Sequence, residues 1–152
     1  MLLKRILKQT LTIVPLTVAG VLANSQTAVA ESQDALVDSG RKIFAQYCSS
    51  CHGLDGHGGG SCARLLKTPP PDLSAIATRR GGKFPTDEIM AQIDGRSVVE
   101  AHGPRDMPVW GRQFSGDVGG GSLGEEVSSG KIQALIHYLQ SIQITGQSNG
   151  AL

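Results

Sequence analysis

The segment Cys48-Ser49-Ser50-Cys51-His52 decides how the rest of this 152-residue chain is interpreted. Residues three apart are neighbours on a helical turn, so the two thiols lie side by side and the imidazole follows directly. Cys-x-x-Cys-His is the attachment signature of c-type haem, whose vinyl groups form thioethers with the two cysteines. We therefore expect one covalent haem c on Cys48 and Cys51, with His52 as a ligand of the haem iron.

Two other kinds of site use paired cysteines. A thioredoxin-like redox pair requires a βαβ setting, and a zinc site requires further ligands at metal spacing. Neither is visible, because Cys62 and His57 form only an irregular set in a glycine-rich loop, and neither His57 nor His137 has an evident catalytic partner. We expect Cys62, the odd cysteine, to be a small, partly buried hydrophobe; the alternative is a disulfide to a partner chain.

The N-terminus has the three parts of a secretory signal peptide. They are a basic segment, an apolar stretch and a small-residue cleavage site: Lys4, Arg5 and Lys8, then Leu11 to Ala23, then Ala28-Val29-Ala30. We predict that residues 1–30 are removed and that 31–152 form one domain in the periplasm. The alternative is an uncleaved membrane anchor that faces the periplasm. Against it, about 20 apolar residues are needed to span a bilayer, and polar residues interrupt this apolar run.

Charge and composition narrow the class of partner. The chain has 14 Lys and Arg against 13 Asp and Glu, too even a balance for a protein that binds nucleic acid by neutralising phosphates. We expect no nucleic-acid partner. Aromatic residues make up only 4% of the chain and there are 20 glycines, so the domain has few large side chains for its core. A cofactor in the middle of the fold fits this composition.

The second axial ligand is expected from a methionine. Met107 precedes Pro108, which disfavours helix at Met107 and leaves its thioether on an extended loop able to reach the iron opposite His52. Met90 lies instead in a predicted helix, capped by Thr86 and stopped by Gly95, and is expected to pack. His102, five residues before Met107, offers the alternative of bis-histidine ligation with a lower potential.

On these motifs the chain resembles the class I c-type cytochromes, specifically the small bacterial monohaem members. The resemblance covers about residues 36–143 and rests on Cys48 to His52, Pro69-Pro70-Pro71-Asp72-Leu73, Met107-Pro108-Val109-Trp110-Gly111, and a final helix with Leu135 and Tyr138. It implies an all-α cytochrome c fold in which the N- and C-terminal helices cross around the covalent haem. It also implies that His52 and Met107 are the axial ligands, and that a carbonyl of Pro69 or Pro70 accepts the His52 Nδ1 proton.

Apolar periodicity predicts a helix at each end of the domain. The spacing is helical in Leu36, Gly40, Ile43, Phe44 and Tyr47, and again in Ile132, Leu135, Ile136, Leu139 and Ile142. A glycine inside a helix costs stability, so Gly40 indicates close approach by another element, which the resemblance identifies as the last helix near Tyr138; the alternative is a frayed helix start. The haem is expected among Phe44, Leu73, Ile76, Ile93, Val109 and Trp110, with the Trp110 indole as a candidate donor to a propionate. Residues 116–124 are expected to be a flexible glycine insert.

These features predict a periplasmic protein that carries one electron and is not an enzyme, because one-electron exchange at iron needs no catalytic acid, base or nucleophile. Its partners are expected to be redox proteins, including a membrane respiratory complex. One alternative is a fixed electron-entry subunit of a larger membrane respiratory oxidoreductase. Another is a haem enzyme or sensor with an open sixth position. A basic loop is expected to steer acidic partners: Arg64, Lys67, Arg79, Arg80 and Lys83.

Overall fold

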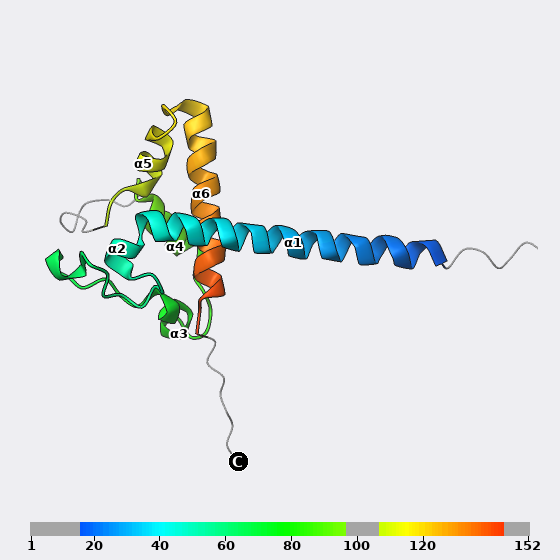
Figure 1. The fold of residues 1–152 in the computed structure, drawn as a ribbon, viewed down its shortest axis with the longest axis horizontal. Coiled ribbons are helices and arrows are strands. Elements are labelled where there is room, and N and C mark those ends of the chain that lie inside the picture. The colour runs from blue at the N-terminus through cyan, green and yellow to red at the C-terminus, as the bar shows by residue number, and fades with distance from the viewer. Residues whose placement is uncertain (1–15, 97–106, 145–152) are drawn as a thin grey trace, which may run out of the picture. The chain divides into compact units, whose positions relative to one another are not determined.

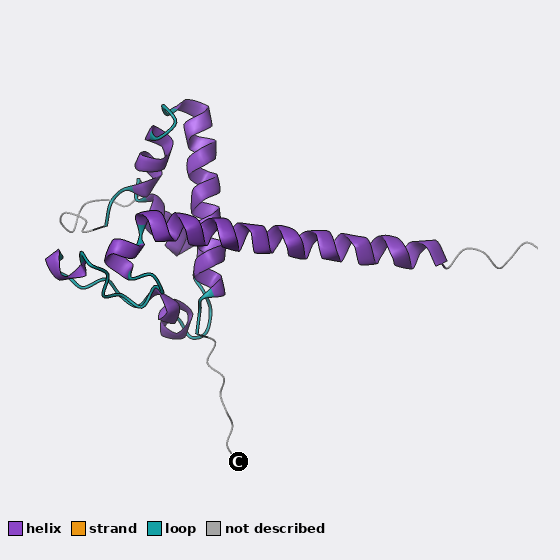
Figure 2. Ribbon diagram, in the orientation of Figure 1, coloured by secondary structure: helices purple, strands orange, loops and turns teal. Residues whose placement is uncertain are grey.

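The computed structural model describes residues 16–96 and 107–144, and in these ranges it contains helices and loops but no strand (Figures 1 and 2). The helices are α1 (Leu16–Tyr47), α2 (Ser49–His52), α3 (Ile76–Arg79), α4 (Thr86–Asp94), α5 (Trp110–Gly116) and α6 (Gly121–Ser141). Two short 3-10 turns, η1 (Ala63–Leu65) and η2 (Leu73–Ala75), lie in the loop region after α2. The predicted all-α class is confirmed.

The chain divides into two units, residues 1–35 and 36–152, and α1 begins in the first unit and ends in the second. Within the first unit α1 is continuous from Leu16 through Ala30 and Glu31, so the proposed cleavage point lies inside a helical stretch. Removal of residues 1–30 stays a prediction. No helix among the described residues combines the length and hydrophobicity that a bilayer-spanning segment needs.

The end of α1 packs against α6 at Gly40. A Cβ built at Gly40 would lie 1.9 Å from the Ala134 carbonyl oxygen and 2.8 Å from Cβ of Tyr138, so only glycine permits this approach. One turn further along α1, Phe44 meets Tyr138 with ring centroids 5.1 Å apart. The predicted close contact of the terminal helices is therefore confirmed, and Gly40 lies well inside α1 rather than at a frayed start.

The core of the second unit collects side chains from α1, α4, α5 and α6. Its buried members are Phe44, Ile93, Phe114, Ile132, Leu135, Ile136, Tyr138 and Leu139. Around them lie half-buried hydrophobic residues that include Leu73, Met90 and Trp110. Met90 thus packs from α4, as its helical setting predicts.

Two local predictions were wrong: the N-cap of α4, and the flexible insert at residues 116–124. Pro85, not Thr86, occupies the N-cap of α4; Thr86 is the first helical residue, and its hydroxyl accepts a 3.1 Å hydrogen bond from Gln140 of α6. The stop at Gly95 was correct, because Gly95 takes a left-handed conformation with φ 71°.

The segment 116–124 is not a flexible insert but the turn of a helical hairpin (Figure 1). Helix α5 ends at Gly116 and α6 begins at Gly121, and Gly119 and Gly120 reverse the chain with φ of 88° and 74°. A Cβ at Gly124 would lie 2.6 Å from Ser115 Oγ, so this glycine lets the two helices approach closely. Gly119 and Gly120 thus serve the turn and Gly124 the close packing of the helices, roles that composition does not distinguish from flexibility.

Candidate functional site

Cys48, Cys51 and His52 lie on a short turn that continues from the end of α1. The Cys48 N–H donates to the Phe44 carbonyl at 2.9 Å, which ties the turn to the last residues of α1. Cys51 and His52 both donate their N–H groups to the Cys48 carbonyl, at 3.2 and 2.9 Å. The three side chains are half-buried and neither thiol is in a disulfide. The structure therefore brings the three residues of the motif together.

The loop after His52 folds back and binds the carbonyl groups of this turn. Gly58 donates to the His52 carbonyl at 2.8 Å, Gly60 to the Cys51 carbonyl at 3.2 Å, and Cys62 to the Ser50 carbonyl at 2.8 Å. These bonds satisfy carbonyls that a short helix leaves without partners. A Cβ at Gly60 would lie 2.3 Å from the Ser50 oxygen, so the loop can approach only with glycine there.

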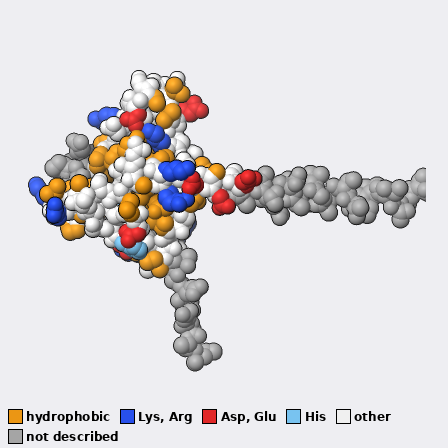
Figure 3. Space-filling model, in the orientation of Figure 1, with side chains coloured by type: hydrophobic (Ala, Val, Ile, Leu, Met, Phe, Trp, Pro, Cys, Tyr) orange, Lys and Arg blue, Asp and Glu red, His pale blue; other side chains and the backbone are white. Residues whose placement is uncertain are grey.

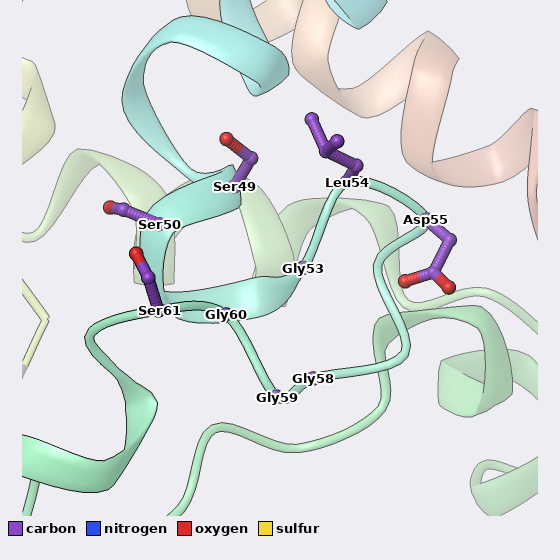
Figure 4. Close-up of a pocket in the computed structure, with 9 residues that line it drawn as sticks. All are labelled: Ser49, Ser50, Gly53, Leu54, Asp55, Gly58, Gly59, Gly60 and Ser61. Carbon is purple, nitrogen blue, oxygen red and sulfur yellow. The ribbon is translucent and has the colours of Figure 1, made fainter.

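An open cleft of about 600 Å³ borders the same turn (Figure 4). Its lining is formed by three serines, four glycines, a leucine and an aspartate: Ser49, Ser50, Ser61, Gly53, Gly58, Gly59, Gly60, Leu54 and Asp55. None of the predicted haem ligands lines it. Because Ser49 and Ser50 separate the two cysteines along the chain, the cleft borders the spacer residues of the motif and does not correspond to the candidate haem site.

The environment of the turn disfavours charge on its side chains. Burial raises the pKa of the Cys48 thiol to about 12, and the neighbouring Cys51 adds to the increase. Burial lowers the pKa of His52, and the Pro71 backbone carbonyl partly opposes this effect. The Pro71 carbonyl therefore lies near the ring. Nδ1 of His52 is buried and makes no hydrogen bond with the described residues. The resemblance implied Pro69 or Pro70 at this place; the structure puts Pro71 there.

These residues fit a covalently bound haem. Two neighbouring thiols outside any disulfide supply the sulfurs of two thioethers, and the next residue supplies an imidazole. An unpartnered buried nitrogen costs free energy, whereas a metal-bound histidine normally directs its other ring nitrogen at a carbonyl such as that of Pro71. The donor set therefore agrees with haem c, and the Pro71 carbonyl near the ring is the kind of acceptor that the second nitrogen of a metal-bound histidine uses.

The segment of Met107 is joined to the Cys48 turn by aromatic side chains. Tyr47, the residue before Cys48, meets Trp110 at a centroid distance of 5.7 Å and Phe114 at 5.2 Å. Trp110 and Phe114 stack at 5.6 Å. Met107 itself is half-buried and packs, like Cys48, against the core cluster. The two segments predicted to hold the iron therefore share one apolar neighbourhood.

The start of α5 is also fixed to α4 and α6. Arg96 binds the carboxylate of Asp94 at 2.8 Å and that of Glu125 at 2.5 Å, and these partners raise its pKa. A Cβ at Gly111 would lie 1.9 Å from Asp94 Oδ1, so this glycine accommodates the ion-paired group. Ser128 of α6, fully buried, donates to the Gly111 carbonyl at 3.1 Å.

Of three further residues singled out in the sequence, His102, Cys62 and His57, the structure describes the last two. His102 lies outside the described residues. Cys62 is half-buried and unpaired within the described part of the chain, as a small hydrophobe would be. His57 has an exposed ring, but it also has two partners, Asp72 and Ser74, which sequence spacing did not indicate because they lie 15 and 17 residues away.

Among the basic residues of the loop, Arg79 donates to the Asp72 carbonyl and Arg80 pairs with Glu88. Arg64, Lys67 and Lys83 are exposed and form no ion pair within the described residues. Figure 3 shows basic side chains at the left-hand end of the visible face, interspersed with hydrophobic ones.

Comparison with known proteins identifies the family. The model of the family described as cytochrome C oxidase, cbb3-type, subunit III matches residues 35–118, which include the Cys48 turn and Met107 and end before α6. No curated protein and no solved structure matches the chain. The chain belongs to the cbb3-type cytochrome c oxidase subunit III family and is a c-type cytochrome domain that carries covalent haem c and transfers electrons.

Proposed function

We propose that this protein is a periplasmic one-electron carrier whose haem is attached to Cys48 and Cys51 and ligated by His52 and Met107. The observation that carries the proposal is the aromatic contact of Tyr47 with Trp110 and Phe114. This contact links the segment of Cys48, Cys51 and His52 to the segment of Met107. A haem c held there supplies one-electron exchange at its iron.

In this mechanism the chain provides attachment, ligation and exclusion of water. The cysteines would fix the group covalently, and His52 would provide its imidazole, with the Pro71 carbonyl near the ring. Met107 donates a thioether, which favours the ferrous state and raises the reduction potential. The buried side chains of Phe44, Ile93 and Phe114 keep the interior apolar. No described residue is required to move a proton.

The optical spectrum of the ferric protein tests this ligand set. Methionine sulfur on ferric haem gives a weak red charge-transfer band, and we expect Met107→Ala to abolish the band and lower the potential. Met90→Ala is the matched control, because Met90 is also half-buried but packs from α4. An unchanged spectrum and potential in Met107→Ala would contradict the assignment. Carbon monoxide binding to ferrous wild-type protein would favour a haem enzyme or sensor.

A second candidate function is a fixed electron-entry subunit of a membrane respiratory oxidoreductase. The family match favours it, because the family description names a subunit of cytochrome c oxidase. Isolation from native membranes in mild detergent distinguishes the two. A carrier is expected in the soluble fraction beginning at Glu31, whereas a subunit copurifies with the oxidase. Mass spectrometry of the N-terminus decides whether residues 1–30 are retained as an anchor.

We also propose that Arg64, Lys67 and Lys83 attract an acidic redox partner. Their charges are exposed, and Leu65 beside Arg64 is 77% exposed, which offers an apolar contact within a basic surface. Attraction between opposite charges raises the association rate at low salt. We expect electron-transfer rates with an acidic partner to fall with ionic strength, and to fall less steeply for Arg64→Gln combined with Lys67→Gln. Rates that do not depend on salt would refute this surface.

A further inference from the structure

A side-chain cluster with no role in the proposed function lies beside the carbonyl that faces His52. The Asp72 carboxylate accepts hydrogen bonds from the Ser74 N–H at 2.8 Å and from the Ser74 hydroxyl at 2.6 Å, both on Oδ1. Its Oδ2 lies 3.2 Å from Nδ1 of His57. Ser74 is 2% exposed, whereas the His57 and Asp72 side chains reach solvent.

Donor and acceptor counting fixes the proton on His57. Ser74 gives its only hydroxyl proton to Asp72, so the Ser74 oxygen, 3.1 Å from His57 Nδ1, can act there only as an acceptor. The Asp72 carboxylate is also an acceptor. Nδ1 therefore carries a proton in both the neutral and the charged ring. His57 always donates toward Asp72 and Ser74.

The backbone around Asp72 is held as firmly as its side chain. The Asp72 carbonyl accepts from Arg79 at 2.7 Å, and the next N–H, of Leu73, donates to the Gly56 carbonyl at 2.7 Å. The Pro71 carbonyl belongs to the same planar peptide unit as the Asp72 nitrogen. Its direction therefore follows the backbone of Asp72, which caps η2 with φ −64°.

We propose that Asp72, held by His57 and Ser74, is a positioning residue that directs the Pro71 carbonyl at the imidazole of His52. The proposal rests on the proposed ligation by His52 and adds the cluster that orients it. A carbonyl acceptor at one ring nitrogen makes the other a stronger donor to a metal, which stabilises the more highly charged oxidised state. A substitution that lets the Pro71 carbonyl turn away from the His52 ring is therefore expected to raise the reduction potential of the haem.

Three variants of the full haem-loaded protein test the proposal. Asp72→Asn removes the negative charge and leaves one acceptor oxygen in place of two, so Ser74 and His57 can no longer be bound by separate oxygens. Ser74→Ala removes the hydroxyl bond without changing charge. Asp87→Asn, an exposed carboxylate in the first turn of α4, is the control for the loss of one negative charge. We expect both cluster variants to raise the potential, with Asp72→Asn exceeding Asp87→Asn. We also expect them to shift the NMR resonance of the His52 Nδ1 proton in the ferrous protein.

Amide hydrogen exchange distinguishes a cluster that orients the Pro71 carbonyl from one that only stabilises the loop. Loss of a hydrogen bond to a charged group is expected to speed exchange at the Leu73 N–H by about tenfold. Faster exchange with an unchanged His52 resonance and unchanged potential would overturn the proposal, because the cluster would then only brace the loop. Failure of the ligation itself gives a different result, namely a low-spin spectrum that survives in His52→Ala.

Discussion

The two segments proposed to hold the iron are built differently. Around His52 the structure uses backbone: the carbonyls of Ser50, Cys51 and His52 accept from the glycine-rich loop that follows, and Gly60 permits the contact. Around Met107 it uses side chains: the rings of Tyr47, Trp110 and Phe114 pack together.

This difference indicates how each side should respond to change. A backbone contact leaves no room for an added carbon, whereas packed side chains adjust or lose stability in proportion to what is removed. We expect the His52 segment to be intolerant of a side chain at Gly53 or Gly60, where an added Cβ would meet backbone at 2.5 and 2.3 Å. We expect the Met107 segment to weaken by degrees, with the covalent attachment unaffected.

The largest effect is expected from Phe114→Ala. Phe114 is fully buried and meets both Tyr47 and Trp110, and loss of such a ring costs about 3–5 kcal/mol. Urea unfolding of the haem-loaded protein measures this cost, and weakening of the red band reports loosening at Met107. Phe114→Leu is the control and should cost roughly half as much. A loss under about 1 kcal/mol would show that the aromatic contacts do not hold this side.

Gly60→Ala tests the backbone-built side. The new Cβ would meet the Ser50 carbonyl at 2.3 Å, and overpacking against backbone is expected to cost about 3 kcal/mol. Gly130→Ala is the matched control, because Gly130 lies in α6 with nothing within 4 Å of an added Cβ. That control should stabilise the protein by about 0.5–1 kcal/mol. Equal stability of the two variants would remove the special role of Gly60.

Gly111→Ala sharpens the contrast, because here the obstacle is a side chain. The added Cβ would lie 1.9 Å from Asp94 Oδ1, and we expect a cost of about 1–2 kcal/mol. In an Asp94→Ala background the carboxylate is gone and Arg96, whose Nε would lie 2.7 Å from the added Cβ, loses the Asp94 partner. The cost should therefore fall sharply, as a double-mutant cycle by urea unfolding would show. A cost that persists in the double variant would mean that the Arg96 side chain, not Asp94, limits the site.

Lys131→Met is expected to have a smaller effect. The Lys131 ammonium lies 4.8 Å from the Phe114 ring centroid and 5.5 Å from that of Tyr47, and cation–π contacts at such sites are worth about 0.5–1 kcal/mol. Methionine keeps the length of the side chain. The variant also removes the 3.0 Å ion pair of Lys131 with Asp117, so thermal unfolding at low and high salt measures the two contributions together. No change at either salt concentration would exclude Lys131 from the support of the aromatic cluster.

The smallest effect concerns Asp72 and acid. Hydrogen bonds from Ser74, followed by the contact with His57, lower the pKa of Asp72 to about 2 from an ordinary value of 3.8. A lowered native pKa stabilises the fold fully above about pH 3.8, and the stabilisation disappears as the pH falls to about 2. Urea unfolding across this window should show a smaller loss in Asp72→Asn than in wild type. Identical acid profiles would show that Asp72 titrates normally.

Prediction from sequence succeeded where the cause was local. The Cys48 turn follows from spacing along one helical turn, and the contact at Gly40 follows from a glycine in a helical repeat together with the family resemblance. Prediction from sequence failed where a residue's role depends on a residue from another part of the fold. Thr86 has the side chain of a cap but binds Gln140 instead, and the glycines of 116–124 form a tight hairpin because Ser115 lies against Gly124.

The sequence by itself predicted the two main properties of this protein: a covalent haem c, which we propose is attached to Cys48 and Cys51, and an all-α fold. Both predictions rest on residues spaced three and four apart, which are neighbours on the surface of a helix. Only the tertiary structure decided which proline carbonyl faces His52, which residues surround His57, and how the segment of Met107 meets that of Cys48. Those contacts join residues that are between 15 positions apart, as for His57 and Asp72, and 67 apart, as for Tyr47 and Phe114, so they depend on how the chain turns back on itself.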